Sequence, residues 1–232
     1  MGTETFATPL TADEIVALTR EHSFFSWSAQ DAVHPIPMAR GEGCYFWDAS
    51  GKRYFDLNSQ LMCMNIGHGN RRVIDAIKAQ ADELAYAGPS MASRVRAEIG
   101  RELATVTPKG LNKFFFTLGG AEANESAIKI ARAFTGRHKI IARYRSYHGA
   151  TAGAITLTGD HRRWANEPGI AGVVRVFDPY PYRNPLYREG DSDQVFARKC
   201  LDQLEAVLMH EGPQTIAAFF LETVTGTNGI LV

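Results

Sequence analysis

The chain has 232 residues, of which 45% are hydrophobic and 22% charged, a balance typical of a folded globular protein. Its 25 basic and 25 acidic side chains leave no net charge, which argues against nucleic acid or an anionic membrane as the main partner. The three cysteines lack CxxC spacing, so we expect neither a disulfide framework nor a structural zinc site.

The first residues, Met1–Thr5, are polar and acidic and lack the basic and apolar segments of a signal peptide. No apolar run in the chain approaches transmembrane length. These features favour a cytoplasmic location.

The first half of the chain contains several periodic segments. Residues 11–22 predict a short amphipathic helix. Residues 43–57 predict a β-hairpin, because two aromatic-rich runs flank a turn at 48–51. Apolar positions recurring every three or four residues predict two further helices, at about 70–86 and 93–106.

A glycine-containing segment joins a predicted strand to a predicted helix. Phe114–Phe116 has the composition of a short buried strand, and helical apolar spacing begins near Ala123. Between them lies the sequence TLGGAEAN, residues 117–124. Unpaired N–H groups at a helix start, together with the positive end of the helix dipole, form a site for phosphate. Taken locally, Gly119 and Gly120 would equally fit a helix start without a ligand.

The remaining elements alternate between strand and helix. We predict strands at 138–143, 173–177 and 215–222, and a helix at 194–210. This alternation indicates a mostly parallel sheet flanked by helices, which binds ligands beyond the carboxyl ends of its strands. Thr117, Tyr144 and Glu222 lie at or just beyond such ends. Residues 178–193 predict a surface or interface loop.

Val232 follows closely after the last predicted strand, without a closing helix. The α/β layer is therefore expected to be incomplete, either because the chain is a fragment or because it is a truncated product that needs a partner.

Five segments, in order, resemble the class III aminotransferases, the ω-transaminase group of fold-type-I pyridoxal phosphate (PLP) enzymes. They are 41–56 (GEGCYFWDASGKRYFD), 65–69 (NIGHG), 117–125 (TLGGAEANE), 144–151 (YRSYHGAT) and 222–229 (ETVTGTNG). The resemblance covers nearly the whole chain. It implies that residues 1–65 belong to a small domain and that 66–232 begin the large PLP-binding domain.

The resemblance also implies roles for individual residues. Gly120 and Ala121 would donate backbone N–H groups to the cofactor phosphate. Tyr147 would lie against the pyridine ring, His148 and Gly149 would shape that turn, and Glu222 would sit near the ring hydroxyl.

A second group resembles the substrate-side wall of the family: Trp27, Leu61 and Met62. Core packing is an equally good interpretation of Trp27 and Met62. His68, between two glycines, is expected to be structural.

Two family residues have no counterpart in these 232 residues. One is the aspartate that pairs with the pyridine nitrogen, and the other is the lysine that forms the Schiff base. Lys129, the lysine nearest the glycine segment, is expected to pair with Glu125 on a solvated helix face. We therefore expect the isolated chain to be unable to transaminate.

The implied activity is transfer of an amino group from an amine or ω-amino acid to a keto acid such as pyruvate, in a homodimer. Two alternatives remain open at this point. One is a relative of the same fold that acts as an aminomutase, decarboxylase or racemase. The other is a truncated, non-catalytic remnant.

Overall fold

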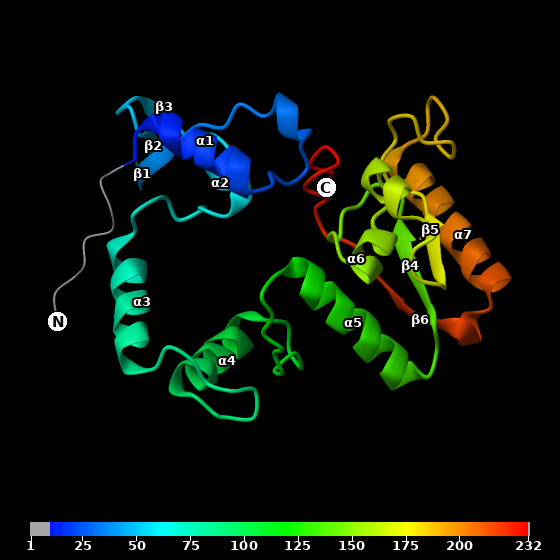
Figure 1. Ribbon diagram of the computed structural model, residues 1–232. Coiled ribbons are helices and arrows are strands. Elements are labelled where there is room, and N and C mark those ends of the chain that lie inside the picture. The colour runs from blue at the N-terminus through cyan, green and yellow to red at the C-terminus, as the bar shows by residue number, and fades with distance from the viewer. Residues whose placement is uncertain (1–9, 232) are drawn as a thin grey trace. The chain divides into compact units, whose positions relative to one another are not determined.

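The computed structural model describes residues 10–231, which form two compact units, one that ends at Ala97 and one that begins at Glu98 (Figure 1). The elements that begin in the first unit are α1 (Ala12–His22), a 3₁₀ turn η1 (Gln30–Ala32), β1 (Met38–Glu42), β2 (Tyr45–Asp48), β3 (Arg53–Phe55), α2 (Ser59–Met62), α3 (Arg71–Glu83) and α4 (Arg94–Val106).

Helix α1 confirms the helix predicted at 11–22, and its start has a local cause. The Thr11 hydroxyl accepts a hydrogen bond from the Glu14 N–H, while the Glu14 carboxylate accepts one from the Thr11 N–H. This reciprocal pair satisfies two N–H groups that a helix start leaves open.

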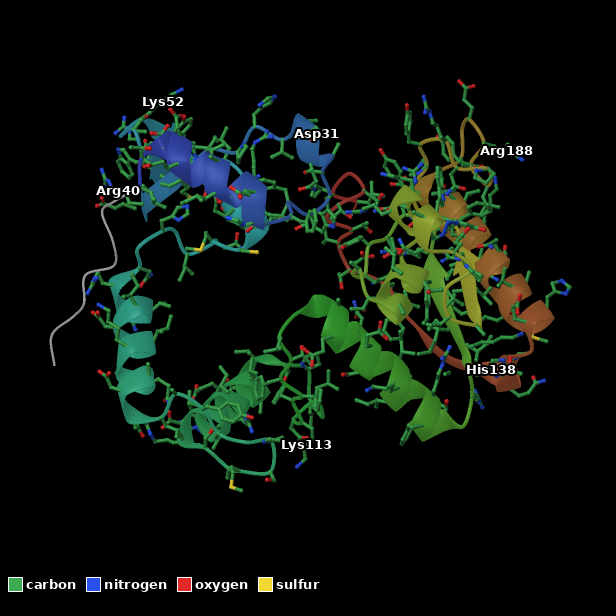
Figure 2. The ribbon with its side chains drawn as sticks, in the orientation of Figure 1. Asp31, Arg40, Lys52, Lys113, His138 and Arg188 are labelled. Atoms are coloured by element: carbon green, nitrogen blue, oxygen red, sulfur yellow. The ribbon has the colours of Figure 1, made fainter. Side chains whose placement is uncertain are left out.

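Strands β1, β2 and β3 form an antiparallel sheet in that order. The β2–β3 pair confirms the predicted hairpin, and Asp48 closes its turn by accepting hydrogen bonds from the N–H groups of Ser50 and Lys52. Figure 2 labels Arg40 on β1 and Lys52 in the turn before β3. The Arg40 guanidinium lies 3.5 Å from the centre of the Trp47 ring. Strand β1 had no signal in the periodicity of the sequence.

The short element α2 is a left-handed turn. Its four residues, Ser59 to Met62, have φ values of 50°, 49°, 59° and 63°, although none of them is glycine. The left-handed helical region costs an L-residue roughly 1–2 kcal/mol. Such a run therefore persists only where neighbouring contacts hold it.

The second unit contains α5 (Gly120–Thr135), β4 (Lys139–Arg143), α6 (Ala152–Leu157), η2 (His161–Asn166), β5 (Val173–Val176), α7 (Asp193–Glu211), η3 (Pro213–Thr215) and β6 (Ile216–Phe219). Its three strands form a parallel sheet in the order β5-β4-β6. These elements confirm the strands and helices predicted beyond residue 117, although β6 ends earlier than predicted.

The core of this unit lies on both faces of β4. Ile140 and Ala142 point to one face, where Ile128 of α5 and Leu157 of α6 pack against them. Ile141 points to the other face and is fully buried. In Figure 1, α5 and α7 lie on opposite sides of this sheet, as an α/β fold requires.

The strand predicted at Phe114–Phe116 is wrong. These residues form no strand, and Phe115 is 72% exposed. Aromatic composition favours an extended segment, but a strand also needs a hydrogen-bonding neighbour, which residues 10–231 do not supply here. No helix in the described part of the chain combines the length and apolarity that a membrane crossing requires.

Candidate functional site

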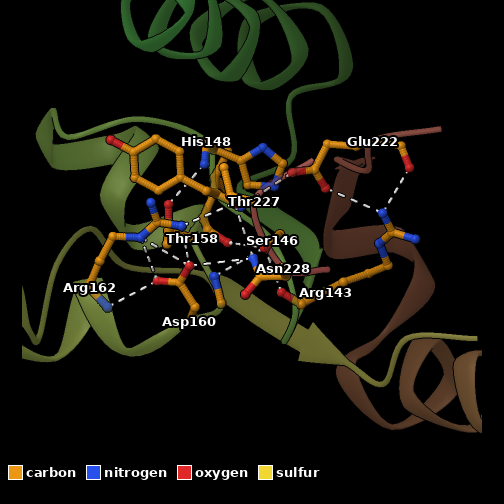
Figure 3. Close-up of polar contacts among 12 residues, drawn as sticks. Arg143, Ser146, His148, Thr158, Asp160, Arg162, Glu222, Thr227 and Asn228 are labelled. Carbon is orange, nitrogen blue, oxygen red and sulfur yellow. Dashed lines mark hydrogen bonds and ion pairs between the residues drawn. The ribbon is translucent and has the colours of Figure 1, made fainter. Parts of the chain in front are cut away.

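Most polar side chains that the sequence singles out lie beyond the carboxyl ends of β4 and β6. Figure 3 shows Arg143 at the end of β4, and Ser146 and His148 in the turn that follows it. Glu222 lies three residues after β6 ends. The two strands are parallel neighbours, so their ends bring these residues together.

The start of α5 is open to a ligand. Its N-cap residue is Gly119, so no N-cap side chain occupies the helix start. The first N–H group with a helical acceptor is that of Ala123, which donates to the Gly119 carbonyl at 3.0 Å. The N–H groups of Gly120, Ala121 and Glu122 therefore have no acceptor within the helix. A Cβ atom added to Gly119 or Gly120 would meet no atom within 4 Å. This helix start can accept an anion.

The turn that contains Tyr147, His148 and Gly149 packs on the first turn of α5. The Asn124 side-chain amide donates to the His148 carbonyl at 2.7 Å, and the His148 N–H donates to the Thr158 hydroxyl at 2.9 Å. Gly149 has a φ of 131°, and a Cβ there would lie 2.6 Å from the Cβ of Ala121. Glycine is thus required for this close approach.

The His148 imidazole is buried, and its Nε2 atom has no hydrogen-bond partner among residues 10–231. Burial lowers the pKa of His148; the nearby Glu222 carboxylate opposes this effect and Arg143 adds to it. The imidazole is therefore neutral at pH 7. In a neutral ring, this free nitrogen can donate a hydrogen bond to a bound molecule or accept one from it, depending on the tautomer.

Glu222 is fixed at both carboxylate oxygens. Its Oε1 accepts from the Tyr147 N–H at 3.2 Å, and its Oε2 from the Arg143 guanidinium at 3.3 Å. The same guanidinium donates to the Thr225 hydroxyl at 2.9 Å and lies 3.5 Å from the Asp178 carboxylate. Burial raises the pKa of Asp178, although a hydrogen bond from the Arg145 N–H and the charge of Arg143 oppose this.

A second arginine supports Tyr147. The carbon atom at the centre of the Arg162 guanidinium lies 3.9 Å from the centre of the Tyr147 ring. The Asp160 carboxylate accepts hydrogen bonds from this guanidinium, which also donates to the Thr227 hydroxyl at 3.1 Å. Asn228 also donates to Asp160 (Figure 3). The arginine over the Tyr147 ring is thus held in place by Asp160 and by the segment that contains Thr227 and Asn228.

Glu125 has a different role from the predicted one. The charge of Lys129 acts on its carboxylate, but the carboxylate also accepts hydrogen bonds from the Thr151 hydroxyl at 2.6 Å and from the N–H groups of Gly153 and Ala154. Glu125 of α5 therefore caps the start of α6. Burial would raise its pKa, but these hydrogen bonds outweigh burial and hold the pKa below its usual value.

The structure divides the candidate residues between the two units. Six lie in the second unit: Gly120, Ala121, Tyr147, His148, Gly149 and Glu222. The other three, Trp27, Leu61 and Met62, lie in the first unit and are 58%, 53% and 52% exposed.

Sequence reasoning missed the residues that hold the site together: Arg143, Asp178, Asp160, Arg162 and Glu125. A polar residue at the carboxyl end of a buried strand was an available signal for Arg143. Asp160 and Arg162 pair with each other across two positions, but their contacts with Asn228 and Thr227 are remote in the sequence, as are the partners of Asp178 and Glu125.

Known proteins resemble this chain over most of its length. The family model described as aminotransferase class-III matches residues 27–232. A probable aminotransferase of Mycobacterium tuberculosis is 35% identical over 206 residues, which cover 85% of this chain and 43% of the relative. The putrescine–pyruvate aminotransferase of Pseudomonas aeruginosa is 29% identical, covering 93% of this chain and 49% of that protein.

Solved structures give the same result. Taurine:2-oxoglutarate aminotransferase from Bifidobacterium kashiwanohense, in complex with PLP and glutamate, superimposes with a TM-score of 0.91 at 39% identity. An (S)-enantioselective ω-transaminase from Thermomicrobium roseum gives 0.90 at 36%. Each match covers 97% of this chain, but only 51% and 52% of the respective structure. The chain thus spans about half the length of these relatives.

The geometry of the second unit fits PLP. The open start of α5 suits a phosphate dianion. The buried Nε2 atom of His148 lacks a partner, and Gly149 permits the adjacent turn to approach the helix start. Since the family model covers most of the chain and the fold matches solved members, the chain belongs to the class III aminotransferases, which are PLP-dependent enzymes of fold-type I.

Proposed function

We propose that the protein containing this chain is an aminotransferase that moves an amino group from an amine or ω-amino acid to a keto acid such as pyruvate. The names of its relatives support this donor class, since they act on putrescine, taurine and γ-aminobutyrate. We further propose a homodimer located in the cytoplasm, in which residues 1–65 belong to the small domain and 66–232 to the large domain.

The observation that carries this proposal is the open start of α5 beside the turn that holds Tyr147. The N–H groups of Gly120 and Ala121 would bind the cofactor phosphate, and Tyr147 would lie against its ring. Bound PLP supplies an electron sink for the substrate amine. An aromatic face contributes about 0.5–1.5 kcal/mol beyond the burial of area.

The remaining site residues would orient the ring. Glu222 accepts a hydrogen bond from the Tyr147 backbone and is held in place by Arg143, which would fix its carboxylate near the ring hydroxyl. His148 and Gly149 shape the turn against α5. In the first unit, we assign Trp27, Leu61 and Met62 to the substrate-side wall.

We also propose that a polypeptide of these 232 residues does not transaminate alone. Its lysines are Lys52, Lys78, Lys109, Lys113, Lys129, Lys139 and Lys199. Two of them are engaged elsewhere, since Lys139 pairs with Glu211 and Lys199 with Asp191. None stands in the sequence context of the lysine that the family uses for covalent catalysis.

Two preparations test this proposal, the 232-residue chain and the protein expressed from the complete reading frame that contains it. We expect the complete protein to form alanine from an amine and pyruvate. We expect the 232-residue chain to bind PLP reversibly, with no lysine trapped by borohydride and no turnover. Carbon dioxide release or substrate racemisation by the complete protein, without amino transfer, would favour another reaction of the same fold. Turnover by the 232-residue chain at enzyme-like rates would refute the inactivity proposal.

A further inference from the structure

The left-handed turn of α2 presents a physical problem that the aminotransferase reaction does not explain. Ser59, Gln60, Leu61 and Met62 all have φ between 49° and 63°, a region that L-residues rarely occupy in succession. Two of them, Leu61 and Met62, are the residues assigned to the substrate-side wall. Contacts within the first unit must therefore stabilise the left-handed turn relative to a right-handed one.

The hydrogen bonds within the turn do not make that selection. The Met62 N–H donates to the Asn58 carbonyl at 2.8 Å, and the N–H groups of Cys63 and Met64 both donate to the Ser59 carbonyl at 2.9 Å. Bonds of this spacing form in a helical turn of either hand. The selection therefore has to come from contacts outside the turn.

Asp56 makes two such contacts, and the Asn65 side-chain amide makes another by donating to the Met62 carbonyl at 2.9 Å. The Asp56 Oδ1 accepts from the Gln60 N–H at 3.2 Å, and its Oδ2 accepts from the Gln60 side-chain amide at 3.1 Å. One carboxylate thus binds both the backbone and the side chain of a residue inside the left-handed run. Since Asp56 directly follows β3, the turn is tied to the end of a strand.

His68 holds Asp56 in turn. The His68 Nε2 and Asp56 Oδ2 atoms are 2.7 Å apart, and the two side chains are only 8% and 4% exposed. The His68 backbone pairs with Gly43 in both directions, at 2.8 and 3.0 Å. Its ring fills the space beside Gly41, where a Cβ would lie 2.6 Å from the imidazole Cγ. The imidazole is therefore clamped against the β-sheet.

We propose that Asp56 and His68 are positioning residues that hold α2 in its left-handed conformation and so fix the directions of Leu61 and Met62. In this arrangement the sheet holds His68, His68 holds Asp56, and Asp56 holds the turn through Gln60. The consequence for substrate selection depends on the proposed function, because that function places Leu61 and Met62 beside the substrate. The anchoring itself does not depend on it.

Hydrogen exchange of the purified protein without cofactor tests the anchor. The reporters are the amides of Met62, Cys63 and Met64, which the turn protects. We expect Asp56→Ala to speed their exchange at least tenfold relative to amides of β2 and β3. The matched control is Asp48→Ala, which removes a comparably buried carboxylate from the same sheet. It should speed exchange at Ser50 and Lys52 and leave the three reporters unchanged.

A rescue variant separates anchoring from general loss of structure. Ser59→Gly removes a left-handed penalty without touching Asp56 or His68, so in the Asp56→Ala background it should restore much of the lost protection. Gln60→Ala, at an exposed position, should give a smaller increase of about threefold. This variant decides the matter if Asp56→Ala does not fold.

Two results would overturn the proposal. One is that the three reporter amides exchange in Asp56→Ala and Gln60→Ala as they do in the unmodified protein. The other is that Asp48→Ala speeds their exchange as much as Asp56→Ala does. Neither result bears on PLP binding or turnover, so the anchor and the proposed function can fail separately.

Discussion

The Arg162 guanidinium lies over the ring of Tyr147, 3.9 Å from the ring centre. Asp160 and Thr227 hold the guanidinium in that position through hydrogen bonds. The tyrosine proposed to support the cofactor ring is therefore itself supported by a cation. This arrangement ties cofactor binding to residues that no phosphate-site motif includes.

Replacing Arg162 by glutamine should weaken PLP binding about 3- to 10-fold, the equivalent of ~1 kcal/mol, because a cation–π contact and an anchor of Tyr147 are lost. Titration of PLP followed by fluorescence measures the change. Arg198→Gln is the matched control, since Arg198 is exposed and pairs with Asp202 one turn along α7. Equal affinities of the two variants would contradict the role of Arg162.

Gly149→Ala should weaken both the fold and the cofactor site. The added Cβ would lie 2.6 Å from the Ala121 Cβ, and the backbone φ of 131° disfavours any L side chain. We expect a loss of about 2–3 kcal/mol in the free energy of unfolding, from overpacking and strain together. Urea unfolding gives that value. Gly190→Ala, which also has a positive φ but meets no neighbour within 4 Å, separates the contribution of strain from that of the clash.

Glu125→Gln should destabilise the protein by about 1–3 kcal/mol at pH 7, because three donors lose a charged acceptor. The pKa of Glu125 in the folded chain lies below its unfolded value, so its ionised form stabilises the fold above that unfolded value. This contribution is lost as the pH falls from roughly 4.3 through the folded-state pKa. Urea unfolding at several pH values should therefore show the difference between variant and unmodified protein shrinking in acid. A difference independent of pH would contradict this account.

His148 should lower the free energy of unfolding in mildly acidic solution. Burial lowers its pKa in the folded chain, so the unfolded chain binds a proton more readily. The free energy of unfolding should fall as the pH drops below roughly 6.5, the value for an unperturbed histidine. His148→Gln lacks this group, and its stability should change less between pH 7 and pH 5. Parallel slopes in the two proteins would show that His148 does not carry the effect.

Local patterns in the sequence predicted the elements whose signal is periodic or cap-based. The helices at 12–22 and 120–135 and the β2–β3 hairpin belong to this class. The position of Glu222 beyond a strand end also follows from a local rule, because the carboxyl ends of parallel strands lie at one edge of the sheet. The roles given to Tyr147 and Glu222 come from the resemblance to the family, and they stay predictions.

Contacts between remote residues were not accessible in this way. Arg143 and Asp178 are 35 positions apart, and no spacing rule links them. Glu125 looked like a helix-surface residue because its partners follow it by 26 to 29 positions. The strand at Phe114–Phe116 failed for a related reason, since composition alone does not supply a pairing neighbour. The left-handed turn contains no glycine, so the sequence had no residue that would predict it.

The Arg143 side chain connects three strand ends. A single guanidinium contacts Asp178 beyond β5 and both Glu222 and Thr225 beyond β6, while its own backbone ends β4. One charged group therefore joins the ends of all three parallel strands. Its removal would leave the Asp178 and Glu222 carboxylates, beyond strands at opposite edges of the sheet, without the cation that they share.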